Sequence, residues 1–112
     1  STPQDVALAD AVKGVSMFRK VNVPILGLVE NMSFFECPHC SERTEVFGYG
    51  GARDRAAALE VPFLAELGLD PAVCATSDAG APIVDSAPES SAAKAFDRLA
   101  QSVAERIAAF SG

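Results

Sequence analysis

The sequence is poor in basic residues, in histidine and in long apolar segments. Nine lysine and arginine residues against fifteen acidic ones give a net charge of −6, the wrong sign for neutralising phosphates. This balance argues against a nucleic-acid or anionic-membrane partner. No apolar run approaches the ~20 residues of a membrane-spanning helix, and the first residues lack the basic-then-apolar pattern of a signal peptide. We expect a soluble, cytoplasmic protein.

Cysteine is also scarce and odd in number, with only Cys37, Cys40 and Cys74 in 112 residues. Because 49% of the chain is hydrophobic, one domain of this length can build an apolar core without disulfides. The pattern therefore favours reduced thiols or a bound metal over a disulfide-stapled secreted module. Cys74 lies among alanine and valine in a predicted helix, where we expect it to be a small packing residue.

The first residues predict a helix that begins at Pro3 and runs to about Arg19. Thr2 is the expected N-cap, and Asp5 is placed to complete a capping box. Apolar residues recur at helical spacing on one face, which predicts a one-sided packing helix: Leu8, Ala11, Val12, Val15 and Phe18.

Two short apolar runs, residues 25–29 and 63–67, lack polar alternation and predict parallel strands covered on both faces. Residues 52–59 predict a helix between them, which gives a strand–helix–strand crossover. A short helix from 70 to about 76 and a loop over 78–91 follow. The final helix carries a single apolar stripe made of Ala92, Phe96, Leu99, Ala100, Val103 and Ile107.

Two central strands are too few for this many helices, because a parallel sheet normally has several strands and both faces covered. The fold class is α/β, with a parallel sheet flanked by helices. Either a second copy completes the sheet, or residues 1–112 are the C-terminal part of one larger α/β domain. The residues alone leave both arrangements open.

Residues 34–47 interrupt the α/β pattern and predict an inserted hairpin. Cys37 and Cys40, in the order Cys-Pro-His-Cys, lie between extended pieces at 34–36 and 43–47. Two thiolates at this spacing suit zinc or an iron–sulfur cluster, but two further ligands are required. His39 is expected to point outward and not to serve as a ligand. The simplest source of the two further ligands is therefore a second copy of the chain, related by a two-fold axis.

Two other interpretations of the Cys-Pro-His-Cys segment stay open from the residues alone. Cys37 and Cys40 can be free surface thiols without metal. The same four residues also occur in thiol–disulfide oxidoreductases, where the first thiolate lies at a helix N-terminus. The residues after Cys40 favour an extended arm over a helix, which argues against redox catalysis.

Asn31 directly follows the first strand, where open α/β sheets place residues that contact ligands. Its amide offers one acceptor and two donors, which suits an adenine edge; a turn or capping role fits its position equally well. Asp70, after the second strand, can line the same crevice or cap a helix that begins with Pro71. The segment 48–51, Gly-Tyr-Gly-Gly, lacks the lysine of a phosphate loop and predicts a turn into a helix.

Several segments resemble, in order, the C-terminal half of the Mrp/NBP35 family. They read T-P-Q-D-V-A-L, V-P-I-L-G-L-V-E-N-M-S, C-P-H-C, F-G-Y-G-G, L-D-P and S-A-A-K-A-F, and they span nearly the whole chain. These proteins are MinD/ParA-like P-loop ATPases that carry iron–sulfur clusters. E-N-M-S followed by C-P-x-C is the specific part. The sequence departs at Ser41, where the family usually has glycine, and at Gly68, where proline is common.

The resemblance implies that Cys37 and Cys40 bind a [4Fe–4S] cluster shared by two subunits of a homodimer, for transfer to apo iron–sulfur proteins. It also implies that Asn31 contacts the adenine of ATP, with the Asp70 loop nearby. Two alternatives remain: a structural zinc-knuckle dimerisation module and a thiol–disulfide oxidoreductase.

The sequence contains no G-K-G-G-x-G-K-S/T phosphate loop and no magnesium-binding aspartate of that family. Without backbone amides and a lysine around the phosphates, nothing positions a γ-phosphate. We therefore assign no catalytic residue to this chain and do not expect it to hydrolyse ATP alone. The intact protein is expected to bind ATP and magnesium and to act as an ATPase.

Overall fold

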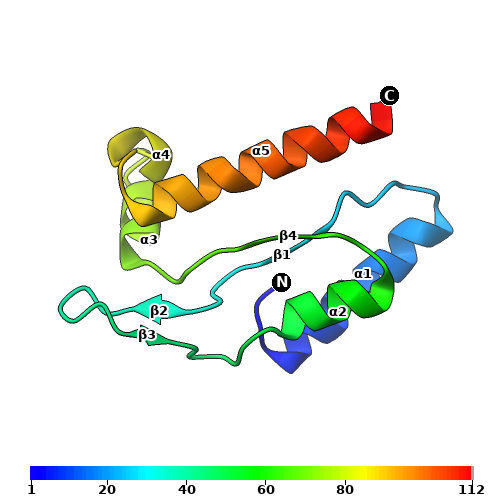
Figure 1. The fold of residues 1–112 in the computed structure, drawn as a ribbon, viewed down its shortest axis with the longest axis horizontal. Coiled ribbons are helices and arrows are strands. Elements are labelled where there is room, and N and C mark those ends of the chain that lie inside the picture. The colour runs from blue at the N-terminus through cyan, green and yellow to red at the C-terminus, as the bar shows by residue number, and fades with distance from the viewer. Residues whose placement is uncertain (112) are drawn as a thin grey trace.

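The computed structural model describes residues 1–111 as a two-stranded parallel sheet between two layers of helices (Figure 1). The sheet consists of β1 (Leu28–Glu30) and β4 (Phe63–Glu66). One face is covered by α5 (Ser91–Ser111), and the other by α1 (Asp5–Lys20) and α2 (Gly51–Leu59). The predicted α/β class, with parallel strands flanked by helices, is confirmed.

The N-terminus departs from the predicted helix cap. Helix α1 begins at Asp5 with Gln4 as N-cap, so the prediction of Thr2 as the cap was wrong. Within residues 1–111 no side chain caps this helix. The physical reason lies in the sheet. The Ser1 ammonium group donates to the Val29 carbonyl (2.8 Å), and the Asn31 amide donates to the Ser1 carbonyl (2.6 Å). This parallel-type pairing along β1 holds the first residues extended.

Strand β1 starts three residues later than predicted, at Leu28 rather than residue 25. Pro62 precedes β4 and has no N–H, so it cannot donate to the segment before Leu28. Its carbonyl instead accepts the Leu28 amide at 2.8 Å, and the ladder continues from there. The two segments that follow β1 and β4 stay paired, because the Ser33 amide donates to the Leu67 carbonyl (3.0 Å).

The predicted hairpin forms, with shorter strands than expected. Strands β2 (Phe35–Glu36) and β3 (Arg43–Thr44) pair antiparallel within the range 34–47. The hairpin projects from the carboxyl ends of β1 and β4, beside α3 (Pro71–Asp78) (Figure 1). Its two cysteines, Cys37 and Cys40, therefore lie at the tip of a protrusion and not within the helical layers.

The predicted loop over 78–91 contains a one-turn helix, α4 (Ile83–Ser86). Ile83 is buried and anchors this turn to the rest of the chain. The glycine, proline and serine residues around it had favoured a loop. Cys74, expected to pack inside, is exposed on α3, where its thiol donates to an Asp78 carboxylate oxygen at 3.7 Å. The packing prediction for Cys74 was wrong because α3 buries none of its residues.

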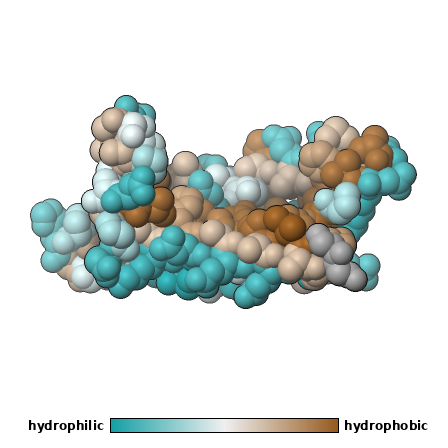
Figure 2. Space-filling view, turned by 90° about the horizontal axis from the view of Figure 1, so that it is seen from above, coloured by the Kyte–Doolittle hydropathy of each residue, from teal (hydrophilic) through white to brown (hydrophobic). Residues whose placement is uncertain are grey.

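The buried apolar core is small and is contributed by several elements: Leu8, Val15, Ala52, Ala56, Leu67, Ile83 and Ala93. The predicted stripes are only partly covered. Phe18 of α1 is 42% exposed, and Ile107 of α5 is 50% exposed. Figure 2 shows apolar surface along the face that includes α5. Among the described residues, no helix is both long and apolar enough to cross a bilayer.

Two glycines offer a matched test of the packing between the strands. A Cβ at Gly27 would lie 2.6 Å from Leu64 Cγ and 2.8 Å from the Pro62 carbonyl oxygen, whereas at Gly14 in α1 it would meet no atom within 4 Å. Gly27→Ala should lower the free energy of unfolding by about 1–3 kcal/mol through overpacking. Gly14→Ala should raise it by about 1 kcal/mol through helix propensity. Urea unfolding measures both, and shifts in the same direction would contradict the strand packing.

Candidate functional site

The side chain of Glu30, the last residue of β1, ties the two ends of the hairpin to the sheet. Glu30 is fully buried, and its Oε2 accepts the Ala52 amide at the start of α2 at 3.0 Å. Its backbone carbonyl accepts both the Leu67 amide (2.8 Å) and the hydroxyl of buried Ser33 (3.3 Å). The chain enters the hairpin after Ser33, leaves it at residue 47 and reaches Ala52 through a short turn. Glu30 therefore fixes the base of the cysteine hairpin.

Asn31 follows Glu30 at the carboxyl end of β1 and is exposed. Its Oδ1 accepts the amide of Met32 at 2.9 Å, and Met32 has a left-handed backbone with φ of 55°. The turn role considered from the sequence is thus present. The Nδ2 group makes no hydrogen bond within the described residues, so both of its donors are unused there.

Asp70 caps helix α3, the second of the two roles considered for it. Its Oδ1 accepts the Ala72 amide at 2.9 Å, and Pro71 occupies the first helical position. Asp70 also lines a cavity beside the hairpin, whereas Asn31 is not among the residues that line it. The structure thus places the two proposed nucleotide residues after neighbouring strands without bringing both into that cavity.

The cysteine tip is a tight turn closed by backbone hydrogen bonds. The Ser41 amide donates to the Cys37 carbonyl (2.8 Å), and the Cys37 amide donates to the Glu42 carbonyl (2.9 Å). Ser41 has φ of 60°, a left-handed conformation that glycine adopts most easily. Position 41, where the resembled family usually has glycine, therefore has a backbone conformation that favours glycine.

The two thiols differ in environment. Cys37 is half-buried, while Cys40 and His39 are exposed. The backbone amides of Cys40 and His39, with a smaller contribution from the Cys40 side chain, lower the pKa of the Cys37 thiol. Hydrogen bonds to sulfur favour the thiolate, which is the form that binds metal. No helix begins at Cys37, so the structural basis of a thiol oxidoreductase is missing.

Arg43 fastens the hairpin to the sheet. Its guanidinium lies 3.7 Å from the centroid of the Phe34 ring, and Nη2 is 3.4 Å from Oε2 of Glu66 at the end of β4. Glu66 also pairs with Arg53 of α2 at 3.3 Å. Both pairs are partly exposed and individually weak, but together they hold three elements around one carboxylate.

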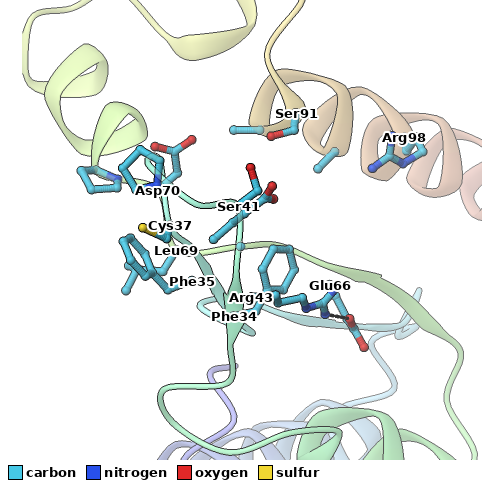
Figure 3. A pocket seen from close by; sticks show the side chains of 16 residues that line it. Phe34, Phe35, Cys37, Ser41, Arg43, Glu66, Leu69, Asp70, Ser91 and Arg98 are labelled. Carbon is cyan, nitrogen blue, oxygen red and sulfur yellow. Dashed lines mark hydrogen bonds and ion pairs between the residues drawn. The ribbon is translucent and has the colours of Figure 1, made fainter.

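A cavity of about 540 Å³ lies between the hairpin, the β4–α3 turn and the start of α5. Cys37 and Arg43 line it from the hairpin, Asp70 from the turn, and Arg98 from α5 (Figure 3). Cys40 is not among the lining residues. Within the described residues, no group of three or more metal-ligating side chains gathers at one point. Cys37 and Cys40 are therefore the two candidate ligands that the hairpin offers to a metal.

The comparisons with solved structures define the class of protein. A nucleotide-binding protein from Archaeoglobus fulgidus in complex with ADP matches 71% of this chain and 33% of its own, with a TM-score of 0.62 and 40% identity. The cell division ATPase MinD of Pyrococcus furiosus matches 94% of this chain and 40% of its own, with a TM-score of 0.71 and 30% identity. The fold is that of MinD-like P-loop NTPases.

The family model described as ParA, NUBPL iron-transfer P-loop NTPase, matches residues 1–104. The chain belongs to this family, as the sequence resemblance predicted. It is 54% identical to the "iron-sulfur protein required for NADH dehydrogenase, mitochondrial" of Arabidopsis thaliana and 49% identical to the iron–sulfur cluster transfer protein NUBPL of Dictyostelium discoideum. These matches cover 96% of this chain and 34% and 33% of the relatives, respectively. The chain thus spans about a third of their length.

Sequence reasoning identified the cysteines, Asn31 and Asp70 as candidates but missed the residues that position them. Glu30 was quoted as part of the E-N-M-S motif without a role, although a carboxylate directly after a buried apolar run needs a partner. Arg43 and Glu66 carry no motif, and their pairing depends on the folded hairpin. Arg98 also carries no motif and lies outside the predicted apolar stripe of the last helix.

Glu30 gives a direct test of how the hairpin base is held. Glu30→Ala removes a charge-assisted hydrogen bond to the Ala52 amide, and should lower the free energy of unfolding by about 1.5–3 kcal/mol. Glu30→Gln retains an acceptor oxygen for that amide and should cost less. Urea unfolding of both variants provides the measurement. Equal losses in the two variants would show that the hydrogen bond contributes nothing.

Proposed function

We propose that this chain is the cluster-binding part of an iron–sulfur carrier, in which Cys37 and Cys40 bind the cluster that is passed to apo-proteins. The single observation that carries this function is the pair of thiols at the tip of a hairpin that projects from the sheet. Family membership supports it, since relatives carry the names iron–sulfur cluster transfer protein and iron–sulfur cluster carrier protein. The cluster is cargo, not a resident cofactor.

We infer that the bound species is a [4Fe–4S] cluster shared between two copies of the protein. One hairpin supplies two thiolates and a cubane cluster takes four, so two copies related by a two-fold axis satisfy it. The exposure of Cys40 at the tip supports this arrangement, because a partner thiol can approach it without rearrangement. A colourless zinc site of one ion per two chains is the alternative that the same four thiolates would accept.

Reconstitution with iron and sulfide tests the cluster assignment. The protein should gain the broad visible absorption of a [4Fe–4S] cluster, and Cys37→Ser should abolish it. Cys74→Ser is the matched control, because Cys74 is exposed on α3 and is no part of the hairpin. Retention of full absorption by Cys37→Ser, or its loss in Cys74→Ser, would contradict the assignment.

We further propose that residues 1–112 form the C-terminal part of one P-loop NTPase-like domain, with 34–47 as an inserted metal-binding hairpin. The share of the relatives that the chain covers supports this arrangement. In the intact protein, ATP and magnesium bind at the carboxyl edge of the sheet, and the phosphates contact residues outside this chain. Asn31 contacts the adenine and Asp70 lies in the nearby loop. A cytoplasmic location remains a prediction, since one relative is named mitochondrial.

Asn31 tests the nucleotide assignment in the full-length protein. Asn31→Ala removes up to two donors from the adenine edge and should weaken ATP binding about tenfold, equivalent to ~1.4 kcal/mol. Gln101→Ala, an amide removed from the exposed surface of α5, is the matched control and should leave affinity unchanged. Titration calorimetry measures both. Unchanged affinity in Asn31→Ala would remove Asn31 from the nucleotide site.

A further inference from the structure

The 540 Å³ cavity beside the hairpin contacts only one of the two cluster-binding thiols. Cys37 lines it and is half-buried, while Cys40 is exposed at the tip and is not among the lining residues. Figure 3 shows the Cys37 sulfur beside Phe35 and the Leu69–Asp70 turn, on the wall of this cavity. A cluster held by the hairpin would therefore have one ligand next to a cavity and one facing outward.

The size and walls of this cavity suit a protein side chain with its flanking backbone. Its volume falls within the range of about 300–1,000 Å³ typical of ligand sites. Part of the wall is apolar, from Phe35, Leu69, Pro71 and Ala95, and the rest is polar or charged.

Arg98 is the lining cation that is available for an incoming anion. The Arg43 guanidinium is already stacked on Phe34 and paired with Glu66. Arg98, in contrast, makes no ion pair or hydrogen bond to a described residue. A guanidinium lowers the pKa of a nearby thiol and attracts the thiolate. Three carboxylates, those of Glu36, Glu66 and Asp70, also line the cavity. They repel anions in general, so Arg98 favours a thiolate only close to its own guanidinium and does not select acidic proteins.

We propose that this cavity receives a cysteine side chain of the recipient apo-protein, and that the iron bond to Cys37 is the first to be replaced. The recipient thiol gives its proton to water, its thiolate binds the iron, and the iron–sulfur bond to Cys37 breaks. Cys37 departs with its electron pair as a thiolate and takes a proton from solvent, so no iron changes oxidation state. Cys40 retains the cluster during this exchange. The inference rests on the proposed carrier function.

Filling the cavity from α5 tests the inference without touching a cysteine. In the full-length protein, Ala95→Phe places a ring on the cavity wall, and Ala104→Phe places the same ring on an exposed part of α5 that does not line it. Both variants should load cluster with unchanged visible absorption. Ala95→Phe should slow transfer to an apo-ferredoxin at least tenfold, while Ala104→Phe should transfer at the unsubstituted rate.

Two further measurements distinguish the inference from other effects. In the metal-free protein, Ala95→Phe should slow iodoacetamide alkylation of Cys37 several-fold and leave Cys40 unaffected, as read by peptide mass spectrometry. Arg98→Gln should slow cluster transfer several-fold at unchanged loading, and Arg98→Lys should restore most of the rate. These surface substitutions keep the test decisive if Ala95→Phe lowers stability.

The outcomes separate this inference from the proposed function. If the unsubstituted protein loads no cluster, the proposed function fails. If loading is intact but Ala95→Phe and Arg98→Gln transfer at the unsubstituted rate, only the cavity route is wrong. If Ala95→Phe remains folded but cannot load cluster, the cavity houses the cluster itself and the recipient route is overturned.

Discussion

The structure depends on one buried carboxylate at the end of β1. Glu30 accepts the Ala52 amide through its side chain and the Leu67 amide through its backbone, so it joins β1, β4 and α2 at a single point. Its second oxygen, Oε1, is buried and has no hydrogen-bond partner among the described residues. Burying a carboxylate is costly unless it is well bonded. The contacts of Glu30 with Ala52, Leu67 and Ser33 hold the base of the hairpin in place.

This point of attachment lies between the two functions that the proposal assigns to the chain. Asn31, the next residue, faces outward at the carboxyl edge of the sheet, where nucleotides bind in folds of this class. The hairpin with Cys37 begins a few residues later. A movement of the Asn31 edge would reach the hairpin through Glu30 and Ser33, because both are fully buried and hydrogen-bonded to each other. The segment is thus a short physical connection between the proposed nucleotide-binding edge and the proposed cluster-binding hairpin.

The hairpin itself is held by partly exposed contacts, in contrast to its buried base. Arg43 stacks on Phe34 and pairs with Glu66, and these interactions are weaker than a buried hydrogen bond to a charged group. A tip attached in this way can adjust around a cluster while its base stays in place. The buried apolar core of the chain is also small, and large apolar side chains of α1 and α5 remain exposed.

The sequence by itself determined the α/β class, the order of the main elements, the cysteine hairpin and the family, because apolar periodicity, turn residues and the E-N-M-S and C-P-x-C motifs are local signals. Only the tertiary structure decided the cap of α1, the one-turn helix at Ile83, the exposure of Cys74 and the partners of Glu30. The cavity beside Cys37, with Arg98 on its wall, is likewise a product of folding. Each of these features depends on contacts between residues far apart in the chain, such as Ser1 with Val29 and Glu30 with Ala52. Local sequence patterns do not specify such contacts.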